Sequence, residues 1–189
     1  WGQSFPYNKY CPDNCPTGCV ATATAIIMRH YGYPATGRGS NSYTCSYTGT
    51  TLSANFSKSK YDWKSMPMDD GTNSHDQAYD GVARLMSDIG IAVGMNYNPG
   101  GSSASTQTAR LALTDNFGYS SKAKYLYAKR FSANEWQQKL ETEVDNDRLV
   151  LYSASTANGE GHAFVIDGYK NGLFSVNWGW GGYCNGYFS

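Results

Sequence analysis

Charge is scarce in this sequence. Among its 189 residues, 15 are Lys or Arg and 15 are Asp or Glu, so charged residues make up 16% of the chain and the formal net charge is zero. Binding to nucleic acid or attraction to an anionic membrane surface requires an excess of basic residues, and we therefore expect neither. No run of about 18 apolar residues occurs, so we also expect no membrane span.

The chain also lacks a basic-then-apolar signal segment, and it begins at Trp1 rather than Met. We interpret the start at Trp1 as a fragment or a processed form, and the low Lys content with abundant Tyr, Asn, Ser and Gly as typical of a secreted, extracellular protein. What is abundant is glycine, with 21 residues, and tyrosine, with 16. This composition is typical of a folded protein rich in strands and turns, and it argues against disorder and against long coiled helices. The length favours one domain, or two lobes that share a cleft.

Apolar spacing predicts helices in the first two thirds of the chain and strands in the last third. Residues 35–60 are expected to form a loop or a hairpin, and no internal repeat is found. The predicted helices run from Thr17 to about Gly32, over 75–90 with Gly90 as the stop, from about Ser105 to Phe117, and from Asn134 to about Asp145. The predicted strands are 149–152, 162–169 and 173–178. We therefore predict an α+β fold with an antiparallel meander at its end.

Cys19 is the first candidate for chemistry because it lies in the first turn of a predicted helix. Helix N–H groups and the positive end of the dipole favour a thiolate there, and the thiolate is the reactive nucleophile. The plainer interpretation is a small buried residue in an Ala-rich helix. A base is needed to favour the catalytic interpretation.

Only three histidines could supply that base. His30 lies about 16 Å further along the same helix, too far to accept a proton from Cys19. His75 begins a polar segment beside Asp76 and is expected at the surface. His162 follows a Gly-Glu-Gly turn and begins an apolar strand, so its ring can emerge into a cleft from a fixed backbone.

A catalytic imidazole needs an orienting partner on its other nitrogen. Asn177 on the next strand is a candidate, provided that the strand register brings it close to His162. Trp178 could cover that hydrogen bond from water, although Trp178 and Trp180 could simply pack. Gln3 could donate an amide N–H to a developing oxyanion, or it could be only a solvated residue.

Four strings spread along the chain are distinctive: Gln3…Pro6-Tyr7-Asn8, Thr17-Gly18-Cys19-Val20-Ala21-Thr22-Ala23, Gly161-His162-Ala163-Phe164-Val165-Ile166-Asp167-Gly168 and Val176-Asn177-Trp178-Gly179-Trp180-Gly181-Gly182. Together, and in this order, they resemble the motifs of the streptopain family of secreted bacterial cysteine peptidases.

The resemblance implies a papain-like two-lobe fold over residues 1–189, with a helical lobe that presents the nucleophile and an antiparallel sheet lobe that presents the histidine. It implies that Cys19 is the nucleophile, His162 the general base and Gln3 an oxyanion-hole donor. Asn177 and Trp178 would then support the histidine. Positions that correspond to the family's substrate cleft are Ser103, Gly161 and Trp180.

The resemblance further implies protein and peptide substrates, a hydrophobic residue two positions before the cleaved bond, and no cofactor or metal. Relatives carry an inhibitory pro-segment and continue beyond the Gly-Tyr-Phe motif, so we expect a mature form without its C-terminal end. Four cysteines, Cys11, Cys15, Cys45 and Cys184, are additional to the catalytic one. We expect them to form two disulfides of unknown pairing; a zinc site or a reduced surface thiol are the alternatives.

Two other functions are compatible with these residues. The same Cys and His could transfer an acyl group to an amine instead of to water. The aromatic residues could instead serve a binding module without catalysis.

Overall fold

The computed structural model describes residues 1–189 and contains four α-helices and two antiparallel sheets. The helices are α1 (Cys19–Tyr31), α2 (Asp80–Ala92), α3 (Thr106–Asp115) and α4 (Ala133–Asp145). The strands are β1 (Ser40–Thr44), β2 (Thr51–Asn55), β3 (Val150–Ser155), β4 (Gly161–Lys170), β5 (Leu173–Asn177) and β6 (Gly186–Phe188). The predicted α+β class and the meander are confirmed, because β3, β4, β5 and β6 pair in that order.

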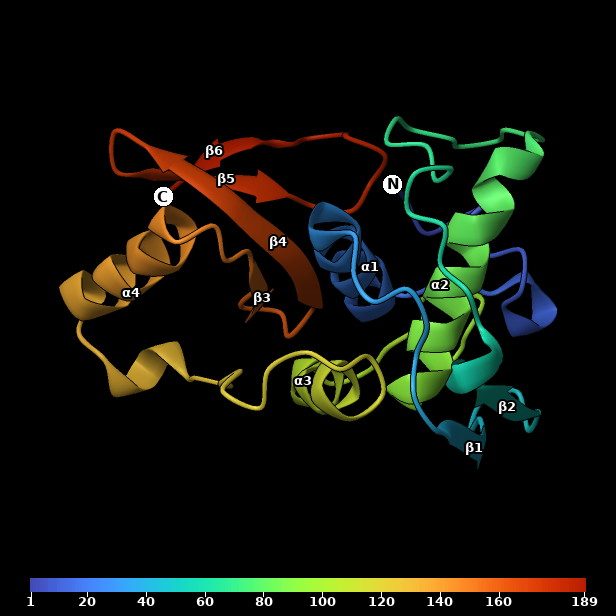
Figure 1. Ribbon diagram of the computed structural model, residues 1–189. Coiled ribbons are helices and arrows are strands. Elements are labelled where there is room, and N and C mark those ends of the chain that lie inside the picture. The colour runs from blue at the N-terminus through green and yellow to red at the C-terminus, as the bar shows by residue number, and fades with distance from the viewer.

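Helix α1 lies between the four-stranded sheet and α2, as Figure 1 shows. Its composition explains this position, since Ala and Thr leave room for close approach on both sides. Eight of its 13 residues are buried. Ala21, Ala25 and Met28 belong to the main core with α2, whereas Ala23 and Ile27 pack with Val165 of β4. The nucleophile candidate therefore begins a helix that both lobes bury.

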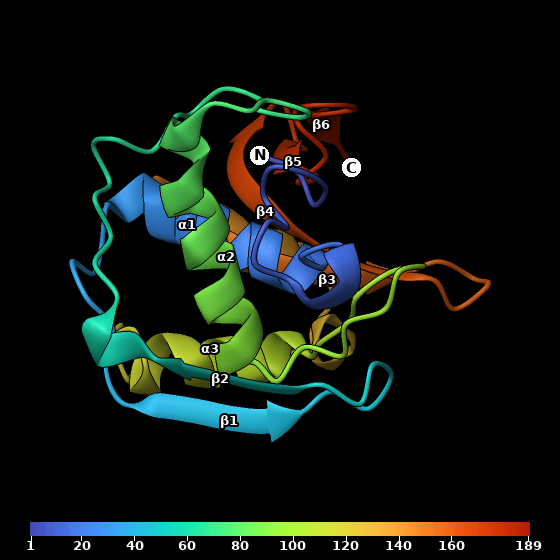
Figure 2. The ribbon, with the colours of Figure 1, turned by 90° about the vertical axis from the view of Figure 1, so that its right-hand side faces the viewer.

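Two elements on opposite sides of the molecule flank this centre. The β1–β2 hairpin runs along the edge of the molecule beside α2, as the turned view in Figure 2 shows. It falls within the segment 35–60 for which a loop or hairpin was expected. On the other side, α4 packs on the sheet through Leu140, which forms a second core with Phe164, Ile166 and Val176. Ser132 begins α4 with a reciprocal capping box to Glu135.

The prediction that Gly90 ends the second helix is wrong. Gly90 lies inside α2, which continues to Ala92 and is followed by Gly94 at φ 65°. A side chain at Gly90 would place its Cβ 2.0 Å from the Tyr97 hydroxyl. The glycine is therefore required by close packing rather than by helix termination.

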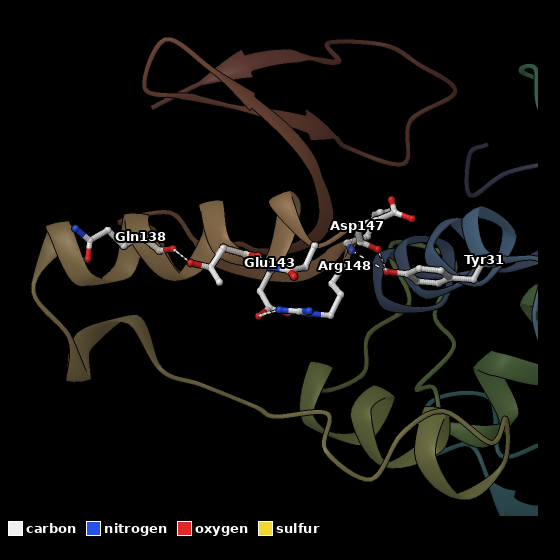
Figure 3. A network of polar contacts seen from close by, with 8 residues as sticks. Tyr31, Gln138, Glu143, Asp147 and Arg148 are labelled. Carbon is white, nitrogen blue, oxygen red and sulfur yellow. Dashed lines mark hydrogen bonds and ion pairs between the residues drawn. The ribbon is translucent and has the colours of Figure 1, made fainter.

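A network of polar contacts joins the end of α1 to the turn between α4 and β3 (Figure 3). The Tyr31 hydroxyl donates to the Asp147 carbonyl at 2.9 Å and accepts from the Leu149 N–H at 2.9 Å. Arg148 in the same turn makes two hydrogen bonds to Glu143, at 2.7 and 2.9 Å. These contacts fix the sheet lobe against the far end of the helix that begins with Cys19.

No helix of the structure combines the length and the apolar character needed to cross a bilayer.

Candidate active site

Cys19 is the first residue of α1, and glycine at the preceding position makes this start possible. Gly18 has φ 85° and a Cβ there would lie 2.8 Å from the Met95 sulfur. The Ser102 hydroxyl donates to the Pro16 carbonyl at 2.6 Å and so holds the Gly-rich loop (residues 100–103) against the segment that leads into the helix. Close packing of two loops therefore determines where the Cys19 side chain emerges.

The structure places the Cys19 thiol and the His162 ring close enough for each to shift the pKa of the other. Burial raises the pKa of the Cys19 thiol, but the hydrogen bonds from His162, from the Ala163 and Val20 N–H groups and the charge of His162 outweigh burial. The net pKa of Cys19 lies below its ordinary value. The arrangement favours a thiolate.

The pKa of His162 moves in the opposite direction. Burial lowers it, but the hydrogen bonds to Cys19 and to the Trp178 carbonyl, together with the Cys19 charge, raise it above its ordinary value. A thiol with a lowered pKa beside an imidazole with a raised pKa favours the thiolate–imidazolium pair over the neutral pair. Both side chains are partly exposed, so a substrate can reach them.

The orienting partner of His162 is a backbone carbonyl. The Nε2 atom lies 2.8 Å from the Trp178 oxygen, and because a carbonyl only accepts, Nε2 carries the proton. The Nδ1 atom is then the ring nitrogen that remains available to exchange a proton with Cys19. The expected hydrogen bond from Asn177 to His162 is absent, and the Asn177 Oδ1 accepts instead from the Gly179 N–H at 3.1 Å.

Strand register explains why Asn177 does not reach His162. Asn177 pairs with Val165, and residues that pair across antiparallel strands share one face of the sheet. His162 lies three positions from Val165, so its side chain projects from the other face. Trp180, which follows the end of β5, lies beside His162, and their ring centroids are 4.8 Å apart.

The remaining sequence-predicted residues lie near this pair or at its margins. The Gln3 carbonyl accepts from the Thr17 N–H at 3.0 Å, which ties the N-terminal arm to the segment before Cys19. Ser103 is exposed on the Gly-rich loop and pairs with Asn96. Gly161 begins β4 and is exposed. Trp178 stacks beside His162 at 6.0 Å, and Trp180 is 44% exposed.

The other two histidines lie apart from Cys19. His30 is exposed and pairs with Asp147 at 3.0 Å, whereas His75 is exposed beside the Phe5 ring. Asn185 was not predicted from the sequence, although its Oδ1 accepts from the Trp178 N–H at 3.0 Å. An Asn in a Gly-rich loop is ordinary turn chemistry, so no pattern distinguished it.

The expected disulfides are not formed, because all five cysteines are free thiols. Cys15 and Cys45 are buried as apolar side chains in the main core, and Cys11 packs against it. Cys184 is exposed on the loop after β5. No group of three or more His, Cys, Asp or Glu side chains is arranged to hold a metal ion.

A large hollow of the molecule lies away from this site. It has a volume of about 1630 Å³ and lies between α4, strand β3 and residues 119–131, and neither Cys19 nor His162 lines it. The volume of a hollow therefore does not identify the candidate site, whereas the opposite pKa shifts of Cys19 and His162 do.

Comparison with known proteins agrees with the geometry. The model of the peptidase C10 family matches residues 1–188. The chain belongs to this family. It is 34% identical over 210 residues to streptopain of Streptococcus pyogenes, and 33% identical over 196 residues to the thiol protease/hemagglutinin PrtT of Porphyromonas gingivalis. All of the chain is covered in both comparisons, but only 52% and 22% of those proteins, so it spans about half the length of streptopain.

Solved structures of the C10 relative interpain A from Prevotella intermedia show the same fold. The active wild-type enzyme superimposes with a TM-score of 0.91 at 36% identity, covering all of this chain and 82% of that one. A prointerpain A fragment superimposes with a TM-score of 0.89 at 35% identity, covering 62% of its chain. The papain-like two-lobe fold expected from the sequence is therefore consistent with the family's structures.

Proposed function

We propose that residues 1–189 form a single papain-like catalytic domain of a secreted bacterial cysteine endopeptidase. The observation that carries this proposal is the Cys19–His162 contact, with the thiol pKa lowered and the imidazole pKa raised by each other. Membership of the peptidase C10 family supports the same reaction class.

The reaction follows from the positions of these groups. The Cys19 thiolate attacks the carbonyl carbon of a peptide bond, and the oxygen takes up the negative charge. His162 gives its Nδ1 proton to the departing amine as the carbon–nitrogen bond breaks, which leaves a thioester on Cys19. Water then attacks the thioester while His162 takes its proton, and release of the acid restores the thiolate.

We assign oxyanion stabilisation to the Cys19 N–H and the Gln3 side-chain amide. The backbone of Cys19 opens α1, where N–H groups have no partners within the helix. The Gln3 backbone is bound at Thr17, two residues before the nucleophile. The proposed role of Gln3 therefore requires only that its side chain turn toward the sulfur.

Substrate contacts are assigned to the exposed groups around the pair. Gly161 offers its backbone at the start of β4, Ser103 lies on the Gly-rich loop, and the exposed face of Trp180 lies beside His162. We propose protein and peptide substrates with a hydrophobic residue two positions before the cleaved bond. We further propose that a pro-segment of the whole protein inhibits the enzyme, because the relative interpain A also exists as a pro-form, prointerpain A.

Casein hydrolysis tests this function. The protein should cleave casein in the presence of reductant, and a peptide-like epoxide should label one thiol and abolish cleavage. Cys19→Ala should lose at least about three orders of magnitude in rate, because no other side chain replaces the nucleophile.

Cys184→Ala is the matched control, since Cys184 is also an accessible free thiol but lies outside the Cys19–His162 pair. It should retain full activity. Appreciable cleavage by Cys19→Ala contradicts the proposal. Transfer of the acyl group to an added amine in preference to water identifies an acyltransferase, and absence of labelling favours a binding module.

A further inference from the structure

The group that orients His162 belongs to the main chain, so no single side-chain replacement removes it. The Trp178 carbonyl oxygen accepts from His162 Nε2 at 2.8 Å. Its direction is determined by the two peptide groups on either side of the Trp178 α-carbon. What holds those peptides therefore controls the histidine.

The following peptide group is bound at both of its ends. Its carbonyl is the one that accepts from His162, and its N–H, on Gly179, donates to the Asn177 Oδ1 at 3.1 Å. Imidazole, peptide and side-chain amide thus form one row of hydrogen bonds. Each hydrogen bond in such a row polarises the next, so an acceptor on the N–H strengthens the carbonyl as an acceptor.

The preceding peptide group is held by a second asparagine. The Trp178 N–H donates to the Asn185 Oδ1 at 3.0 Å, which closes the loop between β5 and β6. The indole nitrogen of Trp178 is buried and has no hydrogen-bond partner. Polar contacts therefore hold this residue only through its backbone.

The loop itself has no regular structure that could fix the carbonyl. Four of its residues have positive φ: Gly179, Gly181, Gly182 and Cys184. A Cβ on Gly179 would lie 3.0 Å from the Thr22 methyl group, so the loop also presses against the first turn of α1. A small rotation of either peptide moves the carbonyl relative to both His162 and Cys19.

We propose that Asn185 is a further positioning residue, which acts together with Asn177 on His162 through the peptide groups flanking Trp178. Neither contacts Cys19 or the imidazole. Together they aim the Trp178 carbonyl at Nε2 and so keep Nδ1 directed at the sulfur. The inference rests on the proposed peptidase function, but its main readout is the reactivity of the Cys19 thiol and does not require peptide hydrolysis.

The test compares Asn177→Leu and Asn185→Leu, which lack the acceptor oxygen, with Asn177→Asp and Asn185→Asp, which keep it. Asn134→Leu on the exposed face of α4 is the matched control. The rate of alkylation by iodoacetamide is measured against pH from the mass of the Cys19 peptide, so that reaction at Cys184 does not interfere.

In both Leu variants, the pH at which Cys19 becomes reactive should rise toward the ordinary thiol value of 9.0. Their kcat/KM should fall about five- to tenfold, as expected for the loss of one neutral hydrogen bond. The Asp variants should recover most of both properties, and the control should match the parent protein.

A Leu variant that is folded and shows the parent alkylation profile overturns the proposal. Loss of activity without a change in that profile also overturns it, because it indicates a merely structural role. Thermal denaturation checks folding, and Asn177→Ala and Asn185→Ala, which also lack the acceptor oxygen, serve if a Leu variant does not fold. If Cys19→Ala remains active, the peptidase function fails, whereas the alkylation profiles still decide the role of the asparagines.

Discussion

Cys19 and His162 each change the protonation of the other, and the direction of both shifts sets the working pH of the pair. The thiolate forms as pH rises through the lowered Cys19 pKa. The imidazolium is lost as pH rises through the raised His162 pKa. Both shifts therefore move the equilibrium from the neutral pair toward the reactive ion pair.

The expected pH dependence of kcat/KM is a bell between the lowered Cys19 pKa and the raised His162 pKa. In His162→Gln the profile should become a single rise near the ordinary thiol pKa of 9.0. Its maximal rate should be about 10²- to 10⁴-fold lower, because no proton donor remains for the amine. Rates of a peptide substrate from about pH 4 to 10 provide the measurement, and an unshifted single rise in the parent protein contradicts the ion pair.

At the scale of single residues, the sequence is sufficient to identify Cys19 and His162 as candidates for the catalytic pair. Each stands at the start of a regular element, and such positions can be recognised from local patterns. The orienting group could not be found in the same way, because every residue carries a carbonyl. Only the pairing of Asn177 with Val165 shows that the amide lies on the wrong face.

The helices follow their sequence patterns closely except where tertiary contacts intervene. α1 ends before Gly32 as expected, since Gly32 adopts the left-handed conformation at φ 56°. Gly90 does not end α2, because Tyr97, seven residues later in the chain, packs its hydroxyl against it. Strand β6 was not predicted, since three residues at a loop end carry little periodic signal.

Two glycines in α2 should respond oppositely to the same substitution. Gly90→Ala should destabilise the protein by about 1–3 kcal/mol, because the new methyl group overlaps the Tyr97 hydroxyl. Gly81→Ala should stabilise it by about 0.5–1 kcal/mol through helix propensity, since its nearest contact lies at an ordinary 3.6 Å. Urea denaturation measures both, and a stabilised Gly90→Ala variant refutes the packing argument.

At the scale of the whole molecule, the active site depends on how the sheet is seated against α1. At the first residue of α1 this interface places Cys19 near His162. At the last residue of α1 it places Tyr31 against Asp147 and Leu149, and we call this second contact the rear contact. The sequence predicts both lobes but not this rear contact. Tyr31 lies more than 100 positions along the chain from Asp147 and Leu149, and both of these residues bind it through backbone atoms.

Tyr31→Phe should lower the free energy of unfolding by about 1–2 kcal/mol, because it removes two hydrogen bonds between α1 and the start of β3. Tyr33→Phe, which loses a single hydrogen bond to Gly118, should cost about half as much. Chemical denaturation of both variants makes the comparison. If both variants lose the same free energy of unfolding, the two hydrogen bonds of Tyr31 stabilise the protein no more than the single one of Tyr33, which contradicts this prediction.

Under the proposed peptidase function the protein is exposed to copies of itself, and the burial of α1 bears on how long each copy survives. Proteolysis needs a stretch of extended, accessible backbone, and loops provide it more readily than packed helices. Because both cores must separate before α1 is exposed, mutual digestion should begin in surface segments such as residues 156–160. The segment that carries the nucleophile should be among the last to be cut, so an ageing sample should contain nicked molecules that still react at Cys19.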